Sequence, residues 1–539
     1  MKVLKDFFPA QSGRTVVFLL AIVFLLVTGG IHSDIYASDK IMREPTPEIT
    51  VNRTNLNFGA VKQGSDSTSS STSPQTLLIN NTGGGTLDWS IHTDDDWLIC
   101  SPNYGTNSGK VKVYAATCPL PPGNHKTNIS IYGHGASNSP QTVPVEVNVY
   151  APGGDAPPFG TFETPVHNST VNSSIPVTGW VLDDVQVDNV KIYNGSSYVG
   201  DAVFVEGARP DVAVANPDTP LNYRAGWGYM MLTNFLPNGG NGTYHITAIA
   251  TDTEGNQTTL GTKTILCDNA HAVKPFGAID TPTQGGAASG SNYLNWGWAL
   301  TPRPNHIPTD GSTINVWVDG VNKGHPSYNR YRKDIAQFFP DYENSDGAAG
   351  LFEFDTTGYA DGVYTIQWTA TDSANNTDGI GSRYFTIDNT GNRNMNKATS
   401  APQNHKCSPP IRIQRIKDLP IDNRTPVKMK KGFEKDIQPR EIYADHDGLI
   451  NIKIKELGRI ELDLSASFTD TSKISGYLLV GDSIQSLPIG STLKDGVFYW
   501  MPGLAFFGKY HLVFIEQGGP YGEEMNRKDF LVEIGPKCE

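Results

Sequence analysis

The chain has 539 residues, of which 18% are charged, and a formal net charge of −13. This length exceeds what one hydrophobic core holds, so we expect three to five domains of about 100–150 residues each. The 55 glycines and 36 prolines favour short strands joined by turns and exclude a helical bundle or coiled coil. The acidic balance argues against a nucleic-acid partner held through phosphates, and five cysteines are too few for a disulfide-dense scaffold.

The N-terminal segment has the pattern of an export signal. Lys2, Lys5 and Arg14 precede an apolar run over residues 15–27. That run suits a secretory signal and is shorter than the roughly 20 residues of a membrane-spanning helix. We therefore predict a signal peptide over residues 1–37, cleaved after Ala37, with an uncleaved N-terminal anchor as the alternative. Either way the protein is expected to be secreted or held at the cell surface, with no other membrane span.

Residues 47–150 contain six segments in which apolar and polar residues alternate with a period of two. This period is typical of strands that bury one face, and the turn-rich stretches between the segments predict a β-sandwich without helices. The segments are 48–52, 77–80, 86–91, 111–114, 128–132 and 143–149.

Four spaced motifs in this region resemble the BACON module, the Bacteroidetes-associated carbohydrate-binding module that is often N-terminal. They are Ser73-Pro-Gln-Thr76, Asn81-Thr-Gly-Gly-Gly-Thr-Leu-Asp-Trp89, Asp96-Trp-Leu98 and Ser139-Pro-Gln-Thr-Val-Pro-Val145. The resemblance implies an immunoglobulin-like fold and a sugar-binding role.

An internal repeat follows. Pro158-Phe159-Gly160 recurs 117 residues later, Gly179-Trp180 recurs 118 residues later, and Ala250-Thr-Asp252 recurs 120 residues later. A period near 120 residues is one sandwich domain and too long for a solenoid unit. The two units, 157–270 and 275–390, resemble bacterial immunoglobulin-like domains of surface and secreted proteins.

The remaining chain is predicted to be a polar linker over 391–410 and a last β-domain over 411–537. In the latter, Trp500-x-Pro502 followed by Gly508-x-Tyr510 resembles the putative-Ig or cadherin-like repeats of bacterial surface proteins. The expected fold class is therefore all-β, a string of about four immunoglobulin-like sandwiches.

An exported chain can form disulfides. Cys100 and Cys118 lie in one predicted domain, and Cys407 and Cys538 bracket the last one, so these are the two candidate pairs. Cys267 is left over. Sequence alone does not fix this connectivity.

No catalytic motif is complete, so we predict that the protein is not an enzyme and uses no cofactor. Gly481-Asp-Ser483-Ile484 is similar to the nucleophile block of GDSL-type hydrolases, but no Asp-x-x-His that could supply the base follows it.

Two loops are weak candidates for calcium because they place oxygen ligands two residues apart before a glycine. Neither has the complete calcium-loop pattern, and ordinary turns rich in Asp and Asn are the alternative. The candidate ligands are Asp445, Asp447, Asn344 and Asp346.

Sugar binding requires exposed aromatic rings beside polar groups. Four aromatic residues have suitable neighbours, with packing inside a sandwich as the alternative: Trp97, Tyr223, Trp227 and Tyr229. The predicted function is non-catalytic extracellular adhesion or carbohydrate binding, with glycans or envelope proteins as partners and weak contacts added by multivalency. The alternative is a structural spacer or scaffold that binds another envelope protein.

Overall fold

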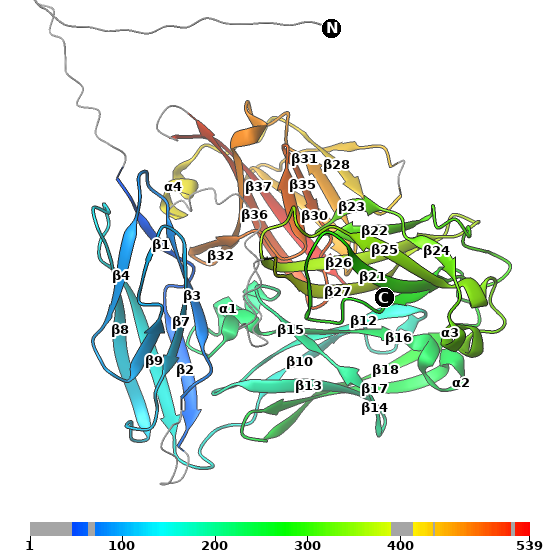
Figure 1. Cartoon of the computed structure of the whole chain (residues 1–539), viewed down its shortest axis with the longest axis horizontal. Helices are drawn as coiled ribbons and strands as arrows, with labels where there is room; N and C mark the ends of the chain where they lie inside the picture. Colours follow the sequence, from blue (N-terminus) through cyan, green and yellow to red (C-terminus); the bar gives the residue numbers. More distant parts are fainter. Residues whose placement is uncertain (1–45, 63–70, 390–412, 435–436, 519–522, 539) are drawn as a thin grey trace, which may run out of the picture. The chain divides into compact units, whose positions relative to one another are not determined.

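The computed structural model of the chain describes residues 46–62, 71–389, 413–434, 437–518 and 523–538 (Figure 1). The predicted signal peptide, the predicted linker and Cys407 lie outside these residues. The described chain forms eight sheets that pair into four sandwiches, which confirms the all-β fold class.

The first sandwich pairs a sheet of order β1-β3-β7-β5 with a sheet of order β2-β9-β8-β4-β6. Alternate residues of its strands fill one core, as Val143, Val145, Val147 and Val149 do in β9. Its strands are β1 (Ile49–Val51), β2 (Leu56–Val61), β3 (Gln75–Asn81), β4 (Asp88–Thr93), β5 (Leu98–Ser101), β6 (Tyr104–Thr106), β7 (Gly109–Ala115), β8 (Gly123–Gly133) and β9 (Gln141–Tyr150).

The second sandwich, repeat 1, pairs the sheet β10-β12-β16-β15 with the sheet β11-β18-β17-β13-β14. Its strands are β10 (Phe159–Thr164), β11 (Thr170–Val171), β12 (Ser174–Leu182), β13 (Val187–Asn194), β14 (Ser197–Asp201), β15 (Val203–Val205), β16 (Gly226–Leu232), β17 (Asn241–Asp252) and β18 (Gln257–Asp268).

The third sandwich, repeat 2, has the same strand order, β19-β21-β25-β24 against β20-β27-β26-β22-β23. The registers also agree, since Phe159 pairs with Leu182 in repeat 1 and Phe276 pairs with Leu300 in repeat 2. Its strands are β19 (Phe276–Ile279), β20 (Gly286–Ala288), β21 (Tyr293–Leu300), β22 (Ile314–Val318), β23 (Val321–Gly324), β24 (Ser327–Arg330), β25 (Ala349–Phe354), β26 (Gly362–Thr371) and β27 (Thr377–Ile387).

The C-terminal sandwich pairs β29-β28-β31-β35-β34 with β30-β37-β36-β32-β33. Its strands are β28 (Val427–Lys431), β29 (Arg440–Ile442), β30 (Leu449–Lys455), β31 (Ile460–Asp463), β32 (Ile474–Val480), β33 (Ser483–Ser486), β34 (Ser491–Lys494), β35 (Val497–Trp500), β36 (Gly508–Gly518) and β37 (Glu523–Gly535).

One topological feature is common to all four sandwiches: an early strand pairs in parallel with the last strand. These pairs are β2 with β9, β11 with β18, β20 with β27, and β30 with β37. The last strand thus has a partner on each side, which ties the start of each sandwich to its end.

Short helices occupy loops in which the sequence indicated none: α1 (Pro210–Ala215), η1 (Asn222–Arg224), η2 (Thr233–Phe235), α2 (Pro237–Gly240), α3 (Lys333–Phe338), η3 (Ser345–Gly347), α4 (Ile413–Asp418) and η4 (Thr471–Lys473). An Arg-x-Asp motif starts α1 and α3. Arg209 binds Asp211 through two nitrogens and pairs with Glu163 on β10, and Arg332 binds Asp334 and Asp280 in the same way. The repeated motif therefore fastens a helix to the first strand of its repeat.

The C-terminal sandwich packs directly on both repeats. Its core includes Val205 and Ala208 of repeat 1 and Tyr384 of repeat 2. The hydroxyl of Tyr384 donates to the Leu504 carbonyl, and the buried hydroxyl of Tyr510 donates to the Ala208 carbonyl. These three sandwiches thus share buried surface as well as covalent connections.

Glu456 is a buried carboxylate at the contact with repeat 1. One oxygen accepts hydrogen bonds from Thr164 (2.9 Å) and Thr178 (3.0 Å), and the other accepts from the Lys537 amide (3.2 Å). Burial disfavours the ionised form and raises the pKa of Glu456 to about 7. Because the pKa is higher than in the unfolded chain, the folded state favours the protonated acid. Its stabilising effect is complete below about pH 4.5 and is lost as the pH rises through about 7.

We predict that Glu456→Gln makes the folded protein less sensitive to pH. The amide keeps a donor and an acceptor, as the protonated acid does, and removes the cost of ionisation, about 1–3 kcal/mol at pH 8. Unfolding midpoints measured from pH 5 to pH 8 should fall less for this variant than for wild type. The exposed Asp188→Asn serves as control and should follow wild type. Parallel curves for Glu456→Gln and wild type would contradict the prediction.

Candidate functional site

The two tryptophans proposed as sugar platforms are buried. Trp97 is 9% exposed and belongs to the core of the first sandwich, and Trp227 on β16 is 0% exposed. The Trp227 ring lies 5.7 Å from the ring of Phe162, centroid to centroid, inside repeat 1. Neither indole presents a face to solvent, so the expectation that they bind a ligand is corrected to a packing role.

Tyr223 is covered by a neighbouring cation. The guanidinium of Arg53, from the first sandwich, lies 3.1 Å from the centre of the Tyr223 ring. Arg53 is also within 4.0 Å of a carboxylate oxygen of Glu206. Burial raises the pKa of Tyr223 to about 12. This ring stacks on Arg53 at a contact between sandwiches and is not free for a sugar.

Tyr229 lines a cavity. The cavity measures about 250 Å³ and also has Asp201, Asp280, Gln284 and Arg383 in its wall. The Tyr229 hydroxyl is occupied, since it donates to the Val199 carbonyl at 3.2 Å. Arg383 is occupied as well, since it donates to the Ile279 and Ser382 carbonyls. The cavity is polar, but its aromatic and cationic groups already have partners.

Tyr104 and Tyr132, which are not among the four predicted residues, are exposed tyrosines of the first sandwich. Tyr104 on β6 is 73% exposed and Tyr132 on β8 is 47% exposed. Both pair with Ser90 on β4, one from each side. Directly paired residues point to the same face of a sheet, so the two rings flank Ser90 on the outer face of the first sandwich. Each tyrosine is one strand spacing, about 5 Å, from Ser90, so the backbones of the two tyrosines lie about 10 Å apart.

The surroundings of these rings are polar. Asp88 and His92 are exposed on the same face of β4 as Ser90, and Thr106 donates a hydrogen bond to Asp88 at 2.8 Å. We call Ser90, Tyr104, Tyr132, Asp88 and His92 the tyrosine face. It combines two apolar ring surfaces with hydroxyl, carboxylate and imidazole groups.

The opposite side of the same strands is packed tightly. Trp89 is buried beneath β6, where a Cβ at Gly105 would lie 2.3 Å from the indole. The indole nitrogen donates to the Asn107 carbonyl at 3.2 Å. Trp89 therefore positions the strand that carries Tyr104.

The exposure of Tyr132 could have been predicted from the alternation of apolar and polar residues in its strand. In the segment 128–132, Ile129 and Ile131 point into the core, so Tyr132 must point outward with Ser130. The prediction of Trp97 rested on its three neighbouring aspartates and not on the phase of the alternation. The phase within the strand would have been the better criterion.

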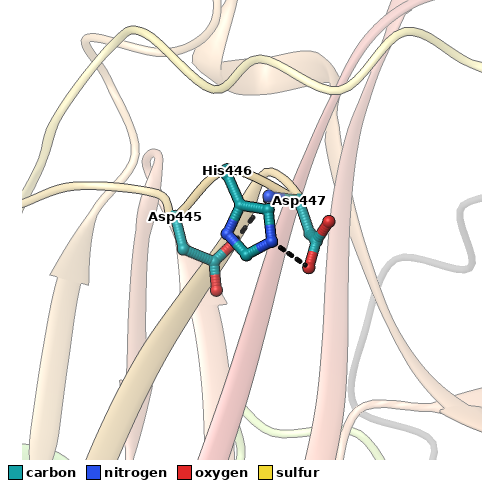
Figure 2. A group of neighbouring side chains, drawn as sticks. All are labelled: Asp445, His446 and Asp447. Atoms are coloured by element: carbon teal, nitrogen blue, oxygen red, sulfur yellow. Dashed lines mark hydrogen bonds and ion pairs between the residues drawn. The ribbon is translucent and has the colours of Figure 1, made fainter.

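The calcium candidate at Asp445 and Asp447 is an exposed turn (Figure 2). The Asp445 carboxylate accepts hydrogen bonds from the amides of Asp447 and Leu449, both at 3.0 Å, and from the Asn451 side chain at 2.9 Å. Asp447 lies 3.2 Å from the imidazole of His446. These contacts describe a hydrogen-bonded Asp turn, which was the alternative interpretation.

Asn344 and Asp346 form a second such turn. Asn344 has a left-handed backbone, and its amide donates to the Gly347 carbonyl at 3.2 Å. Asp346 is exposed. The Asn344 side chain thus closes its own loop.

Cys100 is half-buried and Cys118 is exposed, and their pairing stays a prediction. Cys538 packs against the core of repeat 1, which contains the buried Cys267. The C-terminal cysteine thus lies near the residue that the sequence left unpaired.

Ser483, in the block similar to GDSL-type hydrolases, lies in a hairpin between β32 and β33. Its hydroxyl donates to the Val480 carbonyl at 2.8 Å, and Asp482 pairs with Lys417. The block forms a surface turn.

Comparison with known proteins identifies no family. No family model matches the chain, and no curated protein matches it. Matching solved structures include immunoglobulin domains 1–4 of Sidekick-1, with 9% identity, 90% of this chain and 99% of that chain covered, and a TM-score of 0.20. Fibronectin(III)-like modules of CbhA from Clostridium thermocellum match with 15% identity, 45% and 100% coverage, and a TM-score of 0.15.

A Bacteroides ovatus GH5 xyloglucanase in complex with a XXXG heptasaccharide matches with 16% identity over 29% of this chain and 30% of that chain, with a TM-score of 0.16. TM-scores this low carry no functional inference, so the fold class rests on the strand order described above. The likeness to BACON modules stays a prediction. Among the described residues, no helix has both the length and the apolar character needed to span a membrane.

We predict that Gly105→Ala loosens β6. The added methyl group would meet the Trp89 ring at 2.3 Å, and overpacking of this kind costs about 1–3 kcal/mol. Hydrogen–deuterium exchange in peptides over 86–110 should rise. Gly358→Ala is the control, because a Cβ there meets nothing within 4 Å. Unchanged exchange in Gly105→Ala would show that Trp89 does not fix this strand.

Proposed function

We propose that the protein is a non-catalytic extracellular protein that binds carbohydrate through the tyrosine face. The observation that supports this function is the exposure of Tyr104 and Tyr132 on either side of Ser90. Large aromatic side chains usually bury their rings, so two exposed rings aligned on one sheet need an explanation. The basic and apolar N-terminal pattern supports export.

The chemistry of the face suits a sugar chain. The apolar C–H face of a sugar ring packs on an aromatic ring, while its hydroxyls bond to neighbouring polar groups. Asp88, Ser90 and His92 supply such groups between and beside the rings. One monosaccharide cannot cover two rings about 10 Å apart, so the ligand would be an oligosaccharide or polysaccharide.

We predict that the two tyrosines contribute separately to binding. After a glycan array identifies ligands of the full chain, calorimetry should show that Tyr104→Ala and Tyr132→Ala each weaken binding about tenfold, close to 1.4 kcal/mol. The double variant should bind more weakly than either single variant, because each ring contacts a different part of the sugar ligand.

A matched control is Tyr331→Ala on repeat 2. Tyr331 is 71% exposed, close to the 73% of Tyr104, and lies on a different sandwich from the tyrosine face. This variant should bind like wild type. Equal losses in all three single variants, or none in any, would refute the tyrosine face as the site.

A scaffold that binds another envelope protein is the second candidate. One observation favours it: Phe235 of repeat 1 and Phe338 of repeat 2 are 53% and 64% exposed, and their rings lie 5.6 Å apart. Phenylalanine offers no polar group for sugar hydroxyls, so an exposed pair suits a protein surface.

We predict for this scaffold role that a photo-crosslinker at position 337, the exposed neighbour of Phe338 in α3, captures one envelope protein. Phe338→Ser should abolish the capture, because the partner loses an apolar anchor, and Tyr443→Ser on the C-terminal sandwich should not. Capture that persists in Phe338→Ser would exclude the pair as the docking point.

A further inference from the structure

The two repeats contain the same turn, which follows β17 in repeat 1 and β26 in repeat 2. In repeat 1, one oxygen of Asp252 accepts the amides of Glu254 and Asn256, and the other accepts the Asn256 side chain at 2.9 Å. In repeat 2, Asp372 receives the equivalent bonds from Ala374 and Asn376. Duplication has thus preserved a buried aspartate in one fixed orientation.

Repeat 2 satisfies its aspartate with neutral donors. The Thr301 hydroxyl donates to Asp372 Oδ2 at 2.9 Å, and the Asn305 side chain donates to the same oxygen at 3.1 Å. Thr301 directly follows β21 and is 1% exposed. Neutral hydrogen-bond donors therefore stabilise the Asp372 carboxylate.

Repeat 1 has carboxylates at two positions where repeat 2 has a neutral side chain. Asp183 directly follows β12 and occupies the position of Thr301, and Glu254 occupies the position of Ala374. Asp155 reaches the turn from the segment before β10. Ligand oxygens of Asp155, Asp252 and Glu254 lie within 4.8 Å of one another. The Asn256 amide also donates to Asp155, at 2.6 Å.

Asp183 points to a missing partner. It is 1% exposed, and its Oδ2 accepts the amides of Val185 and Gln186, both at 2.8 Å. Its Oδ1 is buried and has no hydrogen-bond partner among the described residues. Thr301, at the equivalent position of repeat 2, contacts Asp372, and from this we infer that Asp183 lies on the Asp252 side of the turn.

The negative charge of these four carboxylates has no protein cation beside it in the described residues. Within the described part of the chain, none of the three clustered carboxylates or Asp183 forms an ion pair with Lys, Arg or His. Burying carboxylates without a counter-charge is unfavourable, and a bound cation removes that cost.

We propose that repeat 1 binds a calcium ion through the carboxylates of Asp155, Asp252 and Glu254, and that the ion also offsets the negative charge of the buried Asp183. Calcium is the ion of choice because it accepts six to eight oxygen ligands in irregular arrangements, whereas magnesium demands a regular octahedron. Water completes the shell on the exposed side at Glu254. Repeat 2, with Thr301 and Ala374, lacks the site.

The residues of repeat 2 at the equivalent positions suggest two variants that test the proposed site. Asp183→Thr and Glu254→Ala each place in repeat 1 the residue that repeat 2 already carries, so both variants should fold. Calcium chloride titrated by calorimetry into the metal-free full chain should bind to wild type. Each variant should bind at least tenfold more weakly, and magnesium at the same concentration should give no comparable heat.

Asp445→Asn, in the exposed turn of Figure 2, is the matched control and should keep the wild-type affinity. Thermal unfolding gives a second readout, because calcium should raise the melting temperature of wild type and of Asp445→Asn more than that of Asp183→Thr. Absence of calcium binding in wild type, or binding that Asp445→Asn removes and Asp183→Thr does not, would overturn the proposal.

Discussion

Every sheet in the described chain must bury one of its faces. An alternating strand places its apolar side chains on one face, and that face is exposed to water until a second sheet covers it. This constraint decides which aromatic residues are available to a ligand. On β8, Ile129 and Ile131 occupy the core, so Tyr132 lies outside. On β16, Trp227 points into the core and is fully buried. The candidate site follows from strand phase, and aromatic composition does not determine it.

The C-terminal sandwich extends the same constraint to a second surface. The outer face of β16 is covered too, since Gly228 lies against Leu504 and Ala505. A Cβ at Gly228 would approach the Ala505 nitrogen to 2.7 Å, so glycine permits the contact. A sheet buried on both faces explains why the stretch from Tyr223 to Tyr229, which holds three of the four predicted sugar-binding residues, is an interior strand preceded by a covered turn.

The period-two pattern and the repeat offsets were enough to predict the fold class, since both are local properties of the sequence. The parallel pairing of β2 with β9 was not predictable, because it joins residues nearly a whole domain apart. The same limit applies to the site. Tyr132 could be assigned to the outer face from its own strand, but the alignment of Tyr104 and Ser90 depends on the register of three strands. Asp155 meets Asp252 only after the sandwich closes.

Comparing the repeats separates residues that build the fold from residues that add to it. Asp252 and Asp372 close identical turns, so this aspartate belongs to the fold. Asp183 and Glu254 stand where repeat 2 has a hydroxyl and a methyl group, and both substitutions add negative charge at one end of one sandwich. Folding alone gives no reason for that change, because Thr301 already satisfies the turn with a neutral donor. Negative charge at a buried position carries an electrostatic cost, and a bound cation would remove that cost.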